Sequence, residues 1–370
     1  ETRYRGLRFV KSRKPEWTPE NAGSEFASRV LPATELTAKP MSHSRAGKSY
    51  DLDMLCKGVL EGNRTLLSKA ITLIESNSNK HFGQGQELIK RLLPYSGASI
   101  RIAVTGTPGA GKSTFIEAFG SWLIGQGLKV AVLAIDPSSS LSKGSILGDK
   151  TRMEKLSCLP ESFIRPSPSG GVLGGVARKT RESIILCEAA GYDVVLVETV
   201  GVGQSETTVR SMVDFFLLLQ ISGAGDELQG IKKGIMELAD LILVNKADGA
   251  NQLRAEQTRA ELANVLHYLR PITPGWKTEA LTCSALTGAG IPEVWQMIVR
   301  FRDETQKSGQ FEARRRQQVS NWFDTLLTEA VLTKFFSDPA RKLHVDKTRQ
   351  EVEQGELPVV MAVQSLIEHS

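Results

Sequence analysis

A glycine-rich octapeptide at residues 106–113 is the most chemically specific feature of the sequence, because it matches GxxxxGK[ST] at every fixed position. We expect nine residues to bind the phosphates, namely the eight of this peptide and the one that follows: Gly106, Thr107, Pro108, Gly109, Ala110, Gly111, Lys112, Ser113 and Thr114. The backbone N–H groups of such a loop can point inward at phosphate oxygens, and the following helix adds its positive N-terminal end. Lys112 can then reach the β- and γ-phosphates, while the Ser113 hydroxyl can bind Mg²⁺. The loop predicts a site for nucleotide phosphates.

Two acidic residues follow apolar, strand-like runs. Asp136 follows Val130–Ile135, and Glu198 follows Val194–Val197. Carboxylates at the C-terminal ends of parallel strands lie at the edge of the sheet where ligands bind. We therefore expect Asp136 to hold a Mg²⁺-bound water. Glu198 begins the run ETVG, which has the spacing of a DxxG switch with Glu for Asp, and its last residue, Gly201, would sense a γ-phosphate through its N–H.

The run NKAD at residues 245–248 follows another strand-like run and matches the guanine-reading pattern NKxD. Asp248 can accept hydrogen bonds from N1–H and the 2-amino group of guanine, which adenine cannot supply, and the Lys246 stem can lie along the base. The run SAL at residues 284–286 matches the loop whose backbone N–H contacts guanine O6. The expected base-reading residues are Asn245, Lys246, Asp248, Ser284, Ala285 and Leu286. The sequence therefore predicts GTP and GDP, with Mg²⁺, as ligands.

One substitution bears on the rate of hydrolysis. Many small GTPases place Gln directly after the DxxG glycine to orient the attacking water. Here that position is Val202, and the nearest amide side chain is Gln204. We expect hydrolysis by the chain alone to be slow, with Gln204 or a partner protein compensating.

The elements around these motifs predict an α/β fold: a P-loop NTPase with a doubly wound, mainly parallel sheet. Short apolar runs predict strands at Ile100–Val104, Val130–Ile135, Val194–Val197, Phe215–Leu219, Leu241–Val244 and Leu281–Ser284. Helical spacing marks Arg64–Glu75 before the sheet and a stripe from Val319 to Val331 after it. We expect a basic tail at 1–48, a helical segment at 49–96, the nucleotide-binding domain at 97–303 and a helical arm at 304–370.

Composition narrows the classes of partner. The net charge of +5 equals that of residues 1–14, so the rest of the chain is neutral, which argues against nucleic acid as the main partner. No window of 18 apolar residues exists, so we expect no membrane partner. The four cysteines are far apart in sequence and form no CxxC pair. The run Arg314–Arg316 is best interpreted as a solvated helix face.

The tail at residues 1–48 leaves two interpretations open. Its Arg- and Ser-rich composition, in a chain that starts at Glu1, is typical of the remnant of an organellar targeting segment. A disordered tail without a targeting role would have the same composition.

At these motifs the sequence resembles the metallochaperone-type P-loop GTPases, which carry Glu for Asp in the third nucleotide motif. It is most similar to the subgroup that chaperones adenosylcobalamin-dependent methylmalonyl-CoA mutase: the bacterial MeaB type and its mitochondrial counterpart, the methylmalonic aciduria type A protein. The resemblance covers about residues 50–370 and is densest over 100–250. The strings that carry it outside the phosphate loop are Asp136–Ser139, Gly144–Met153, Ile164–Pro168, Leu173–Val176, Glu198–Glu206 and Gly225–Lys232.

The resemblance implies roles for individual residues. Lys112, Asp136, Asp149 and Glu198 would serve catalysis, and Ser113, Asp136 and Glu198 would hold Mg²⁺. A third switch at Ile221–Lys232 would relay nucleotide state to the mutase through Asp226, Gln229 and Lys232. The C-terminal helices would form a homodimer arm, and the protein would help load intact cofactor and remove damaged cofactor. The implied location is the mitochondrial matrix, or the cytoplasm if the chain is bacterial.

Two other classes share a phosphate loop. A GTPase for metal insertion, as in nickel-enzyme maturation, usually carries Cys and His ligands, and the scattered Cys and His residues here weigh against it. A kinase or transport ATPase shares the P-loop, but the guanine-reading run argues against it.

Overall fold

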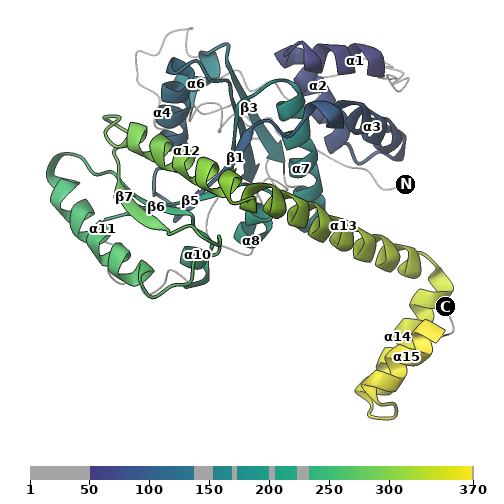
Figure 1. The fold of residues 1–370 in the computed structure, drawn as a ribbon. Helices are drawn as coiled ribbons and strands as arrows, with labels where there is room; N and C mark the ends of the chain where they lie inside the picture. The colour runs from purple at the N-terminus through teal and green to yellow at the C-terminus, as the bar shows by residue number, and fades with distance from the viewer. Residues whose placement is uncertain (1–50, 137–152, 169–172, 200–204, 223–232, 369–370) are drawn as a thin grey trace, which may run out of the picture. The chain divides into compact units, whose positions relative to one another are not determined.

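The computed structural model describes residues 51–136, 153–168, 173–199, 205–222 and 233–368, all within the unit Tyr50–Ser370. Its centre is a seven-stranded sheet in the order β3-β2-β4-β1-β5-β6-β7, in which every neighbouring pair is parallel (Figure 1). The strands are β1 Ile100–Gly106, β2 Val130–Asp136, β3 Ser162–Pro168, β4 Val194–Thr199, β5 Phe215–Ile221, β6 Leu241–Asn245 and β7 Glu279–Thr282. This confirms the predicted α/β fold class.

Helices precede, cover and follow this sheet (Figure 1). Before β1 lie α1 Leu52–Leu60, α2 Arg64–Glu75, α3 Asn79–Leu92 and the 3₁₀ turn η2 Leu93–Tyr95. Between the strands lie α4 Lys112–Gly125, α6 Glu154–Cys158, α7 Leu173–Ala189, α8 Ser205–Arg210, α10 Lys233–Leu238, the 3₁₀ turn η3 Gly249–Asn251 and α11 Gln252–Leu266. After β7 come α12 Ile291–Lys307, α13 Gln310–Phe336, α14 Pro339–Glu353 and α15 Val359–Glu368. No described helix is both long enough and apolar enough to cross a membrane.

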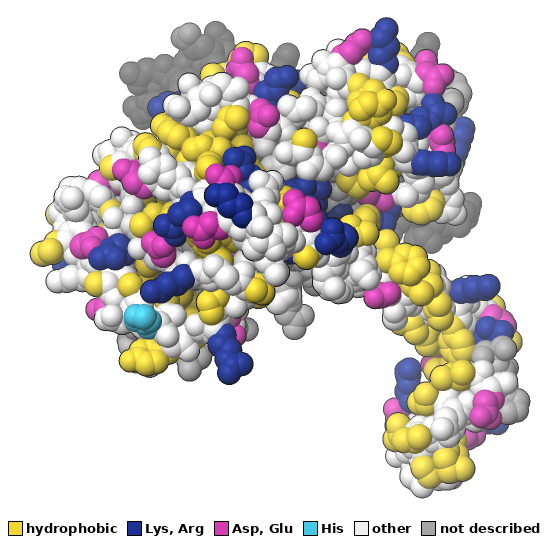
Figure 2. Space-filling model, viewed as in Figure 1, with side chains coloured by type: hydrophobic (Ala, Val, Ile, Leu, Met, Phe, Trp, Pro, Cys, Tyr) yellow, Lys and Arg dark blue, Asp and Glu magenta, His cyan; other side chains and the backbone are white. Residues whose placement is uncertain are grey.

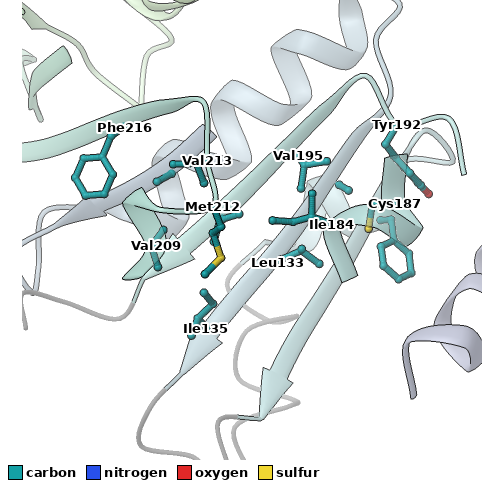
Figure 3. Close-up of a cluster of buried hydrophobic side chains, with 14 of the residues drawn as sticks. Leu133, Ile135, Ile184, Cys187, Tyr192, Val195, Val209, Met212, Val213 and Phe216 are labelled. Carbon is teal, nitrogen blue, oxygen red and sulfur yellow. The ribbon is translucent and has the colours of Figure 1, made fainter. Parts of the chain in front are cut away.

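The two faces of the sheet bury separate cores. On one face, Leu133 of β2, Val195 of β4 and Phe216 of β5 pack with Ile184 of α7 and Val209 of α8 (Figure 3). The helices α1–α3 extend this same core with fully buried leucine and isoleucine side chains. The other face packs under α4 and α12. Because strand side chains alternate between faces, strands covered on both sides must be apolar throughout, as these sequence runs are.

Two strands differ from the sequence-based expectation. The strand expected at Leu281–Ser284 lies at Glu279–Thr282, which leaves Ser284 in the loop that follows. The strand β3 was not predicted, since its sequence contains Pro166 and Pro168. It pairs only with β2 and forms an edge of the sheet, the position where a missing N–H is tolerated.

The expectation that Arg314–Arg316 is a solvated helix face is wrong for its first two residues. The Arg315 side chain is 17% exposed and binds Asp214, itself 1% exposed, through Nε at 2.7 Å and Nη2 at 2.6 Å. Arg315 also donates to the carbonyls of Gly97 and Ser99. Arg314 approaches the buried carboxylate of Asp240, whereas Arg316 is exposed. The start of α13 is therefore fixed to the sheet by buried charge pairs.

These charge pairs predict a stability difference between adjacent arginines. Arg315→Ala leaves the buried Asp214 carboxylate without its bidentate partner, which should lower the free energy of unfolding by about 3 kcal/mol. Arg316→Ala, one residue on and exposed, should change it by less than about 0.5 kcal/mol. Urea-denaturation midpoints of the two variants and the wild type measure this. Equal midpoints for the two variants would contradict the role given to the Arg315–Asp214 pair.

Candidate functional site

The phosphate loop connects β1 to α4 at the carboxyl edge of the sheet. Gly106 has a φ of 149°, and a Cβ there would lie 2.3 Å from the Leu219 carbonyl oxygen of β5, so only glycine fits. Gly111, at φ 85°, occupies the N-cap position of α4, where no side chain caps the helix. The N–H groups of the first turn of α4 are thus free of side-chain caps, as an anion site requires.

The Lys112 side chain lies folded within this loop. Its Nζ donates to the Gly106 carbonyl at 2.9 Å and to the Thr107 carbonyl at 3.2 Å. Burial lowers the pKa of the Lys112 ammonium, while the carboxylates of Glu198 and Glu206 oppose the shift. A phosphate group beside Nζ would favour the charged form in the same way as these carboxylates, so the loop favours an anionic ligand.

Glu206 is a residue of this site that sequence reasoning did not single out. It lies in the first turn of α8 with 1% of its surface exposed and contributes to the field at Lys112. The only sequence signal is its place at the end of the string Glu198–Glu206, which carries part of the family resemblance.

Ser113 and Glu198, both expected to hold Mg²⁺, lie in hydrogen-bond contact. The Ser113 Oγ donates to Glu198 Oε1 at 2.8 Å, and Glu198 is 8% exposed. The register places Glu198 between Val104 of β1 and Ala134 of β2. A hydroxyl and a carboxylate are hard oxygen ligands, and Mg²⁺ typically takes one or two protein ligands and keeps several waters, so this pair fits that ion. Among the described residues there is no group of three or more His, Cys, Asp or Glu side chains that could hold a metal.

The end of β4 is also fixed to β1. The Thr199 Oγ1 donates to Thr105 Oγ1 at 2.8 Å, and both side chains are buried. Thr199 is the last described residue before the expected switch glycine, so the strand that leads into this switch is held beside the strand that leads into the phosphate loop.

The buried side chain of Asn245 joins the phosphate loop to the base-reading loops. Its Nδ2 donates to the Ala110 carbonyl at 2.8 Å. Its Oδ1 accepts from the Ala285 backbone N–H at 3.2 Å and from Cys283 Sγ at 3.4 Å. A Cβ on Gly111 would lie 2.8 Å from Nδ2. One amide therefore connects three segments far apart in sequence.

Asp248 and Ser284 also come together. The Ser284 Oγ donates to Asp248 Oδ2 at 2.5 Å, and the Ala247 N–H donates to the Cys283 carbonyl at 2.9 Å. Lys246 is exposed and adopts a φ of 62°. Leu286 is 81% exposed, which leaves its backbone as the part of this residue suited to a role in base binding.

Some predicted site residues cannot be placed in this geometry. Asp136 ends β2 at the same sheet edge as Glu198, but the position of its side chain is not described. Asp149, Gly201, Asp226, Gln229 and Lys232 lie outside the described residues. Pro108, Gly109 and Thr114 are exposed on the surface of the phosphate loop and its helix.

Comparisons with known proteins give GTPases among the relatives of this chain. The family model described as "Methylmalonyl Co-A mutase-associated GTPase MeaB" matches residues 67–340. The GTPase ArgK of Escherichia coli is 52% identical over 278 residues, covering 75% of this chain and 84% of the relative. The mitochondrial methylmalonic aciduria type A homolog of Mus musculus is 43% identical over 316 residues, covering 83% and 76%.

Among solved structures, a protein titled "LAO/AO transport system kinase" aligns with a TM-score of 0.72 and 42% identity. The alignment covers 86% of this chain and 97% of that protein. These matches show a GTPase with guanine-nucleotide-binding machinery.

The contact between Gly111 and Asn245 predicts unequal effects of two alanine substitutions in the phosphate loop. Gly109 and Gly111 have φ angles of 80° and 85°, so alanine strains both positions similarly. Only at Gly111 does the new Cβ meet Asn245, whereas at Gly109 no atom of the described residues lies within 4 Å. Gly111→Ala should weaken GDP binding by a further factor of roughly ten, because it displaces the Asn245 amide from the Ala110 carbonyl.

Isothermal titration of both variants with GDP measures this difference, and the wild type gives the reference. Equal losses of affinity in Gly109→Ala and Gly111→Ala would show that backbone strain alone matters.

Proposed function

This chain belongs to the family of methylmalonyl-CoA mutase-associated GTPases, and we propose that it uses GTP to gate cofactor loading into an adenosylcobalamin-dependent methylmalonyl-CoA mutase and to protect and reactivate that enzyme. The observation that carries the proposal is the family match over residues 67–340, together with a site that joins phosphate and base recognition through Asn245. The mouse relative, whose name refers to methylmalonic aciduria, supports the same partner.

In this proposal the described residues bind and orient the nucleotide. The phosphate loop and Lys112 hold the phosphates, and Asp248 reads the base. Ser113 and Glu198 would hold Mg²⁺, which, when bound, stabilises charge on the phosphate oxygens. Asp136 and Asp149 complete the proposed catalytic set. Because Val202 occupies the position where Gln is common, the proposed site is incomplete for rapid hydrolysis without a partner.

The alternative function, insertion of a metal such as nickel, gains no support from the described residues. They contain no cluster of three or more metal-ligating side chains, and the buried Cys187 and Cys283 are far apart in sequence.

The proposed homodimer has a candidate surface on α13. Val319, Phe323, Leu327 and Val331 recur every four residues and are each more than half exposed, so they form one apolar stripe on the helix. Figure 2 shows hydrophobic side chains gathered along α13. An apolar stripe of this kind is typical of a surface that another protein covers, and we assign it to a second copy of this chain. Sedimentation equilibrium of the full chain tests the assignment, and a monomer mass at micromolar concentration would contradict it.

The location of the protein stays a proposal. The mouse relative is named as mitochondrial, whereas the ArgK relative is bacterial. We propose the mitochondrial matrix, with bacterial cytoplasm as the alternative. Fractionation of the source cells tests it, and recovery of the protein in a compartment without the mutase would contradict the proposed partnership.

The proposed relay predicts how one lysine affects communication with the mutase. Lys232→Ala should leave GTP affinity and basal hydrolysis nearly intact, because Lys232 lies outside the phosphate and guanine motifs. It should remove most of the rate increase that saturating mutase causes. The measurement is the GTPase rate with and without mutase, for wild type and variant, with the exposed Lys307 changed to Ala as a control of equal charge.

Equal stimulation of wild type and Lys232→Ala would refute the relay. Loss of basal hydrolysis as well would place Lys232 in the catalytic site instead. A wild-type rate that no mutase preparation changes would count against the proposed partnership itself.

A further inference from the structure

The side chain of Asn251 forms a hydrogen-bonded bridge between two loops at the nucleotide edge of the sheet. Its Nδ2 donates to the Lys246 carbonyl at 2.7 Å, and its Oδ1 accepts from Ser222 Oγ at 2.6 Å. Asn251 occupies the N-cap position of α11, where an Asn side chain commonly caps the helix. Here the side chain makes no capping bond. The amide nitrogen and the amide oxygen of Asn251 instead bind Lys246 and Ser222.

One end of this bridge holds a strained residue of the base-reading loop. Lys246 is the only non-glycine residue with positive φ in the described part of the chain. For an L-residue with a Cβ the left-handed conformation is unfavourable, so neighbouring contacts must maintain it. The bond from Asn251 to the Lys246 carbonyl is such a contact. Because Asp248 is only two residues further on, the conformation of Lys246 helps to set the direction of the carboxylate that reads guanine.

The other end of the bridge reaches the end of β5. Ser222 directly follows β5, and the register pairs the last residue of β5, Ile221, with Asn245. Asn251 therefore binds the base-reading loop at Lys246 and also connects this loop to the end of β5, the strand between β1 and β6. The backbone N–H of Asn251 donates to the Asp248 carbonyl at 3.0 Å, and this bond closes the turn from Asp248 to Asn251.

We propose that Asn251 is a positioning residue for guanine recognition. By holding Lys246 in its left-handed conformation it places Asp248 for the 2-amino group and N1–H of the base, while the phosphate loop binds independently of it. The inference rests on the guanine-nucleotide binding proposed above. Its specific consequence is a loss of base selectivity without a matching loss of phosphate affinity.

The test compares two nucleotides that differ in one base group with a phosphate ligand that lacks the nucleoside. GDP and inosine diphosphate differ by the 2-amino group, and magnesium pyrophosphate has no base. Asn251→Ala should lower the GDP preference over inosine diphosphate about three- to tenfold, the size expected for one lost hydrogen bond. Its pyrophosphate affinity should stay within about twofold of the wild-type value, because neither hydrogen bond of the Asn251 side chain is to the phosphate loop. Dissociation constants by calorimetry, with inhibition of GDP binding for pyrophosphate, give these numbers.

Two further variants test the hydrogen bond to the Lys246 carbonyl by itself and control for effects of any substitution on this helix. Asn251→Asp keeps an acceptor for Ser222 but has no donor for the Lys246 carbonyl, so it should lose selectivity at least as much as Asn251→Ala. Asn264→Ala, at an exposed position on the same helix, should match the wild type for all three ligands.

An unchanged GDP preference in Asn251→Ala, or a wild-type preference in Asn251→Asp, would overturn the proposal. Equal weakening of GDP, inosine diphosphate and pyrophosphate would also overturn it, because that pattern shows general loss of structure. If the wild type itself does not prefer GDP, guanine reading fails as a function, and this outcome is distinct from failure of the bridge alone.

Discussion

The buried amide of Asn245 is the constraint on which the nucleotide site depends. A nucleotide carries its phosphates and its base at opposite ends, so a protein that recognises both must fix the distance between two loops. Asn245 does so directly, since its Nδ2 binds the phosphate-loop carbonyl of Ala110 and its Oδ1 accepts from Ala285. The parallel sheet makes this possible, because the carboxyl ends of β1 and β6 lie at one edge with β5 between them.

A second set of buried polar contacts links the nucleotide-binding part to the C-terminal helices. The Gln318 Nε2 of α13 donates to the carbonyls of Arg210 and Val213, at 3.3 and 2.8 Å. These carbonyls lie at the end of α8 and just after it, and α8 is the helix that contains Glu206. Arg181 of α7 binds the Ser211 carbonyl at 2.7 Å in the same turn. Helix α8, which contains Glu206, and helix α13, which presents the exposed apolar stripe, are thus in direct contact.

The sequence predicted best what depends on local chemistry. Residue types at fixed spacing located the phosphate loop, and the structure brings its Ser113 into contact with Glu198 near the end of β4. The features that the sequence did not predict depend on contacts between residues that are distant in sequence. The partly buried Arg315 binds Asp214, which is one hundred and one residues away in sequence. The strand β3 was not predicted, because its sequence contains prolines that a strand tolerates only at the edge of a sheet. The role proposed for Asn251 depends on the conformation of a loop, which hydrophobic periodicity does not predict.

If Asp248 reads guanine through its carboxylate, one substitution should change the preferred base. Asp248→Asn replaces an acceptor with an amide that can donate to the oxygen that xanthine carries in place of the guanine 2-amino group. Dissociation constants for GTP and xanthosine triphosphate should therefore reverse in order, with the wild type preferring GTP and the variant preferring xanthosine triphosphate. A variant that binds GTP as tightly as the wild type and gains nothing for xanthosine triphosphate would contradict the claim.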